Sequence, residues 1–100
     1  MVRMSEREID RLATSDVGAL LDVIESGMHP SSLTFALERI GSAPRDSRIE
    51  CALRAGAAHH DAVVREGAVL GMLAAGGFSG DLADLAATDP SPGVRSVATP

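Results

Sequence analysis

A short pattern of apolar residues and arginine recurs in this chain at a near-constant spacing. The run Val64-Arg65-Glu66-Gly67-Ala68 is matched by Val94-Arg95-Ser96-Val97-Ala98. Leu33 and Leu37 repeat the apolar spacing of Val64 and Ala68 at almost the same offset on the N-terminal side. A separation within about 20–50 residues, such as that between Val64 and Val94, indicates a repeated supersecondary unit. We interpret the unit as a helix, a tight turn and a second helix, present about three times.

Turn residues and helix caps fall where this interpretation needs them. His29-Pro30 and Asp89-Pro90 are separated by two such offsets, and His59-His60 stands midway between them. Apolar residues three and four positions apart predict a first helix near 5–13 and further helices after Pro30 and Asp61. The second helices of the units are expected near 16–26, 46–57 and 81–88. The candidate N-caps are Ser5, Ser15 or Asp16, Ser42 or Asp46, Asp61, and Ser79 or Asp81.

The helix after Asp61 is unusual because nothing in it is charged beyond Glu66. Two apolar stripes are expected to face neighbouring helices: Val64, Ala68 and Met72, and Val63, Gly67, Leu70 and Ala74. Gly67 and Gly71 are expected to permit close helix packing. A third stripe, Val69 and Leu73, is a candidate docking surface if it is exposed to solvent.

Composition narrows the classes of function. The sequence has nine arginines, no lysine and fourteen acidic residues, and its net charge of -5 argues against binding to nucleic acid. The sixteen alanines and two aromatic residues favour an all-α fold with close helix contacts. No signal peptide or apolar run long enough to cross a bilayer is visible, so we expect a cytoplasmic protein without membrane contact.

The reactive residues form no catalytic pattern. His59, His60 and Asp61 suggest a metal cluster, but adjacent histidines point in different directions and no ligand follows at i+4. Cys51, the single cysteine, is expected to lie mid-helix as a small buried hydrophobe. Asp81 and Asp84 could be a pair of acids, but their positions are more typical of the solvent-facing first turn of a helix, where the helix dipole favours acidic residues. We therefore expect no enzyme activity, no cofactor and no bound metal.

The segment Asp89-Pro-Ser-Pro-Gly-Val-Arg-Ser-Val-Ala98 resembles the start of a HEAT-like repeat of the phycobilisome-lyase type, and 59–73 resembles the same helix. The resemblance covers about 16–100. It implies a short right-handed α-solenoid of about three helical hairpins in a single domain over 1–100. The helix at 5–13 would cap one end, and the C-terminal repeat would be truncated. In such repeats the turn aspartate and the arginine hold the units in register. The residues carried over to this framework are Asp61, Arg65, Asp89 and Arg95.

A repeat without a catalytic constellation predicts a protein–protein interaction or scaffold module. Its concave face would be formed by the second helices, where the outward polar residues are Asp22, Arg48, Arg54 and Asp84. The uncovered C-terminal repeat predicts a protein partner or self-association, including a homodimer. Two alternatives stay open: an acidic neutralising protein of the antitoxin or immunity type, and an accessory subunit of a bilin lyase-like enzyme.

Overall fold

The computed structural model describes all 100 residues and contains helices without strands, so the all-α prediction is confirmed. A single bridge between Val2 and Met28 is the only strand-like pairing. The seven helices are α1 (Glu6–Ser15), α2 (Val17–Gly27), α3 (Pro30–Ile40), α4 (Ser47–Ala57), α5 (Ala62–Ala75), α6 (Ser79–Thr88) and α7 (Pro92–Ala98).

Most helices begin at the caps that the sequence provides. Ser5, Asp16, Asp46 and Asp61 each accept a hydrogen bond from a backbone N–H in the first turn of the following helix. Helix α6 differs, and the prediction of Ser79 or Asp81 as its cap is wrong. The N-cap residue of α6 is Phe78, which makes no side-chain cap hydrogen bond. Its side chain is buried in the main core, so packing fixes where this helix starts.

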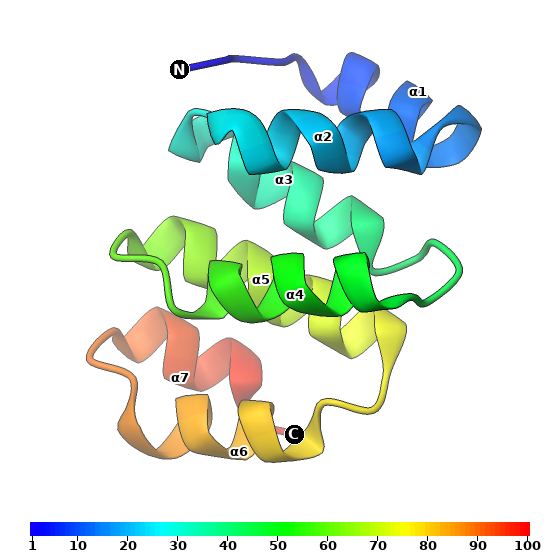
Figure 1. Cartoon of the computed structure of the whole chain (residues 1–100). Helices are drawn as coiled ribbons and strands as arrows, with labels where there is room; N and C mark the ends of the chain where they lie inside the picture. Colours follow the sequence, from blue (N-terminus) through cyan, green and yellow to red (C-terminus); the bar gives the residue numbers. More distant parts are fainter.

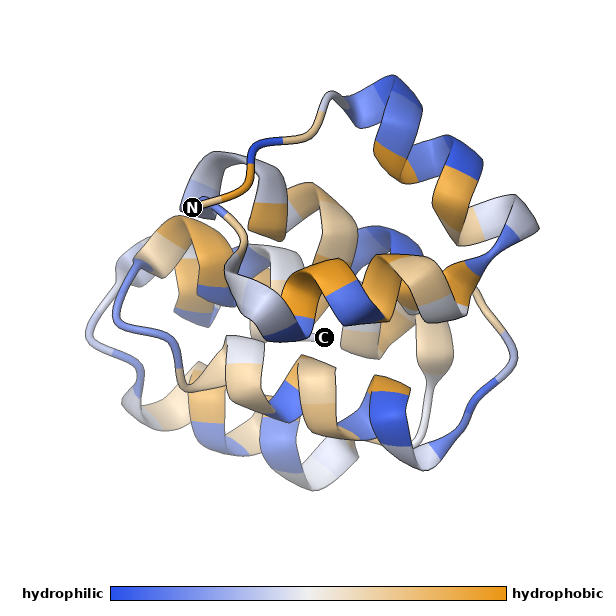
Figure 2. Ribbon diagram, turned by 45° about the horizontal axis from the view of Figure 1, so that its top comes forward, coloured by the Kyte–Doolittle hydropathy of each residue, from blue (hydrophilic) through white to orange (hydrophobic).

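The helices form two rows. Figure 1 shows α2, α4 and α6 in front, with α1, α3, α5 and α7 behind them. In the rear row α3 contacts α1 and α5, and α5 also contacts α7. The two chain termini lie at opposite ends of the stack (Figure 1). Figure 2 shows that α1 is largely hydrophilic, and Ile9 is its only buried residue.

Glycines bring α3 and α5 close together, as predicted from Gly67 and Gly71. A Cβ atom added at Gly67 would overlap the carbonyl oxygen of Thr34, and one added at Gly71 would overlap that of Leu37. Backbone atoms cannot move aside as a flexible side chain can, so these two positions require glycine. This contact fixes α5 against α3 within the rear row.

The packing of α5 corrects two expectations. Val64, Ala68 and Met72 are buried in the main core, as predicted. Val69, a candidate docking residue on the condition that it is exposed, is buried in a smaller cluster with Val94 and Ala98 because α7 covers it. Of the second expected stripe only Gly67 is buried, whereas Val63, Leu70 and Ala74 are exposed. The free side of α5 therefore lies between α3 and α7.

The expectation that Cys51 is buried is also wrong, because its side chain is exposed. Helix α4 turns Ile49, Leu53 and Gly56 inward, which places Cys51 on the outer side of the helix.

None of the seven helices combines the length and apolar character needed to cross a bilayer.

Candidate functional site

Three of the four polar residues predicted for the front row form ion pairs: Asp22, Arg48 and Arg54. Arg48 donates to Asp22 at 2.8 Å and to Glu25 at 2.9 Å. Both hydrogen bonds raise the pKa of Arg48, and the one to Glu25 contributes most. Arg54 lies 3.6 Å from Asp81, with the nearest atoms being Nε and Oδ1. Asp84 is exposed and forms no ion pair. Because most of these charges are already neutralised by neighbours, this face offers few free groups to a partner.

A groove of about 360 Å³ opens between α2, α3 and α4. The small residues of α4 leave room for this groove, and Cys51 forms part of its wall. Two groups at its edge are already engaged: Glu25 accepts from Arg48, and His59 Nδ1 accepts from the backbone N–H of Asp61 at 3.0 Å. Partial burial and the nearby His60 lower the pKa of His59, which favours its neutral form. The groove lining consists of Ile24, Glu25, Leu33, Leu37, Cys51, Ala52, Ala55, Gly56 and His59.

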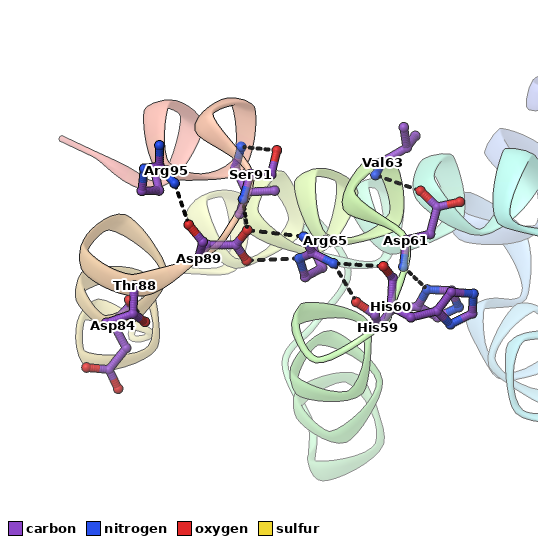
Figure 3. Close-up of polar contacts among 11 residues, drawn as sticks. His59, His60, Asp61, Val63, Arg65, Asp84, Thr88, Asp89, Ser91 and Arg95 are labelled. Atoms are coloured by element: carbon purple, nitrogen blue, oxygen red, sulfur yellow. Dashed lines mark hydrogen bonds and ion pairs between the residues drawn. The ribbon is translucent and has the colours of Figure 1, made fainter.

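A buried ion pair joins the helical hairpin α4–α5 to α6–α7 (Figure 3). Arg65 donates through Nε to Asp89 Oδ2 at 2.9 Å and through Nη2 to Oδ1 at 3.1 Å. The side chains are only 11% and 3% exposed, respectively. Burial disfavours the charge of Asp89, but the hydrogen bonds from Arg65 and the backbone of Ser91 outweigh it and lower the pKa of that carboxyl. The bidentate geometry is that of a strong charge-assisted contact.

The two arginines of the recurring pattern make the same backbone contact. Arg65 Nη1 donates to the carbonyl oxygen of His59 at 2.9 Å, and Arg95 Nη1 donates to that of Asp89 at 2.6 Å. Each arginine thus reaches the carbonyl six residues before it (Figure 3). Asp61 takes a different role from Asp89, since it caps α5 through Val63 and forms no ion pair. Three of the four expected framework residues therefore meet at one junction.

The histidines next to this junction stack on each other, so the expectation that adjacent histidine side chains point in different directions is wrong. The ring centroids of His59 and His60 lie 4.3 Å apart. No three or more His, Cys, Asp or Glu side chains come together in a group that would hold a metal ion. The carbonyl groups of both histidines accept from Arg65, so this turn belongs to the junction between hairpins.

Three large apolar side chains on α5 are exposed, and we call them the α5 stripe: Val63 (52%), Leu70 (39%) and Leu73 (50%). The only other exposed large hydrophobic residues are Met1 and Val2. Separations of seven and three residues place the members of the stripe on one side of the helix. The stripe lies where α5 is covered by neither α3 nor α7.

Sequence reasoning found Leu73 but missed Val63 and Leu70. Arg65 does not lie on the exposed side of α5, because it points into the junction with Asp89. Glu66 could have indicated this side, because it lies on the same side of α5 as Val63 and Leu70 at three- and four-residue spacings.

Comparison with known proteins gives no match. No family model, no curated protein and no solved structure is similar to this chain at a significant level. Relatives therefore assign no role to the junction, the groove or the α5 stripe.

Proposed function

We propose that this chain is a non-catalytic protein–protein interaction module, built as a short right-handed α-solenoid of about three HEAT-like hairpins. Two rows of helices and a shared arginine contact at successive turns support the solenoid interpretation. The fold positions α5 at the centre of the rear row, where α3 and α7 hold it on both sides. A rigid central helix is a suitable site for binding because little order must be gained when a partner docks.

The α5 stripe is the observation that carries this proposal. Isolated exposed apolar residues are common on protein surfaces, but here three lie along one helix. Each remains in contact with water in the free protein, and a partner that covers them would gain the free energy of removing that surface from water. An ordered partner surface therefore has a defined place to bind.

Affinity capture from the native host tests the proposal. Tagged wild-type chain, the double variant Leu70→Ser/Leu73→Ser and the control Val2→Ser are used as baits under identical conditions. Val2 is also exposed but lies outside the stripe, so it controls for general loss of apolar surface. We expect a protein retained by wild type and Val2→Ser, and depleted about tenfold on the double variant.

Circular dichroism must first show equal helix content in all three baits, so that a loss of capture reports on the surface. The proposal is wrong if no protein is retained specifically, or if the double variant retains the same protein as well as wild type does.

A further inference from the structure

One acidic residue lies among the apolar side chains of the α5 stripe. Glu66 is half-buried on the same side of α5, three residues after Val63 and four before Leu70. Its side chain forms no hydrogen bond and no ion pair, unlike most acids of this chain. The carboxylate lies close to Gly93 at the start of α7, where it closes one edge of the stripe.

The opposite edge of the stripe is formed by α3, where the one acid is already paired. Thr34 of α3 donates through its hydroxyl to the carbonyl oxygen of Val63 at 2.8 Å, which places this side of α3 next to the start of α5. Glu38 follows one turn after Thr34, on the same side of α3. The neighbouring Arg39 pairs with Glu38, since its Nη1 lies 3.1 Å from Glu38 Oε2, and it also contacts α1, where its Nε lies 2.5 Å from Asp10. Arg39 is thus engaged by these two acids, and Glu66 is left without an ion-pair partner.

This charge distribution separates the candidate occupants. Two copies packed α5 against α5 would bury two Glu66 carboxylates against leucines without a cation, which is unfavourable. An anionic membrane surface would repel the unpaired Glu66. A partner helix with a basic residue at this position would satisfy Glu66 and cover the apolar residues at once.

We infer that the α5 stripe binds an amphipathic helix of a protein partner, with a lysine or arginine opposite Glu66 and apolar residues opposite Val63, Leu70 and Leu73. The inference rests on the proposed function and names the chemistry of the partner. The seven- and three-residue spacing of the stripe matches the spacing at which apolar residues recur along one side of a helix. The apolar contacts supply affinity, and Glu66 selects a basic over an acidic helix.

Two synthetic peptides test this chemistry by fluorescence anisotropy. Both are helical designs of equal length with leucines at the same heptad positions, flanked by lysine in one and by glutamate in the other. We expect the lysine peptide to bind about tenfold or more tightly than the glutamate peptide. Glu66→Gln reduces this preference, and Leu70→Ser/Leu73→Ser weakens binding of the lysine peptide about tenfold. Glu8→Gln, an exposed change on α1, serves as the charge-matched control.

Several results would overturn the inference. They are equal binding of both peptides, no binding of either, or a preference that Glu66→Gln leaves unchanged. Sedimentation equilibrium tests the alternative that a second copy of the chain occupies the stripe. A wild-type dimer that Leu70→Ser/Leu73→Ser dissociates would assign the stripe to that second copy. Capture of a host protein through the stripe, combined with failure of the lysine peptide, would refute the basic-helix inference and leave the proposed function standing.

Discussion

Replacing Asp89 by asparagine should be among the most damaging single changes in this protein, although it hardly alters side-chain volume. The carboxylate accepts from Arg65 Nε at 2.9 Å, from Arg65 Nη2 at 3.1 Å and from the backbone N–H of Ser91 at 2.9 Å. An amide would keep one acceptor oxygen, turn an NH₂ group towards a donor and leave the Arg65 charge buried without a counter-ion. Breaking a buried ion pair in this way costs about 3–5 kcal/mol. That is a large part of the roughly 5–15 kcal/mol by which small domains are stable.

Urea unfolding followed by circular dichroism at 222 nm and pH 7 measures this loss, because the chain has no tryptophan to report by fluorescence. The matched control is Asp10→Asn. Its contact with Arg39 is shorter, at 2.5 Å, but the two side chains are 53% and 31% exposed. Exposed pairs contribute about 0–1 kcal/mol, so the control should lose no more than that. Equal losses in the two variants would refute the argument that burial, and not distance, determines the strength of the pair.

Two further predictions use the same unfolding assay. The folded-state pKa of Asp89 is lowered, so its contribution to stability is complete above its ordinary pKa of 3.8 and is lost as pH falls through the lower folded value. Wild type should therefore lose more stability than Asp89→Asn between pH 5 and strongly acidic conditions, and parallel pH profiles would contradict this. Gly71→Ala places a methyl group against the backbone of Leu37 and should cost about 1–3 kcal/mol. Gly80→Ala meets nothing within 4 Å and should instead stabilise α6 by up to about 1 kcal/mol, so a stabilised Gly71→Ala would refute the close-packing argument.

Local features of the fold were predictable from the sequence because their causes are local. Asp46 and Asp61 cap the helices that follow them, since a short acidic side chain reaches the free N–H groups of the first turn. The buried positions Val64, Ala68 and Met72 follow from helical spacing alone. Gly67 and Gly71 indicated a close helix contact, although the sequence did not show that α3 would be the partner.

Features that depend on distant parts of the chain were not predictable in the same way. Val69 is buried only because α7, which carries Val94 and lies a whole hairpin later in the chain, packs across it. Cys51 is exposed because α4 turns Ile49, Leu53 and Gly56 towards the core, which leaves Cys51 on the outer side of the helix. The Arg65–Asp89 contact has a separation of 24 residues, and only the resemblance to a repeat indicated that the two residues would meet.

Helix α5 carries both side chains that the fold requires and apolar side chains that stay partly exposed. Its inward side chains are explained by the contacts with α3, α4 and α7, and Arg65 is explained by Asp89. Leu70 and Leu73 are explained only in part, because 39% and 50% of their surface stays exposed in the folded chain. The exposed part gains nothing from folding, whereas a partner that covers it would remove it from water. This exposed apolar part of α5 is the basis of the proposed binding surface, and in that proposal Glu66 supplies the charge that selects one partner over another.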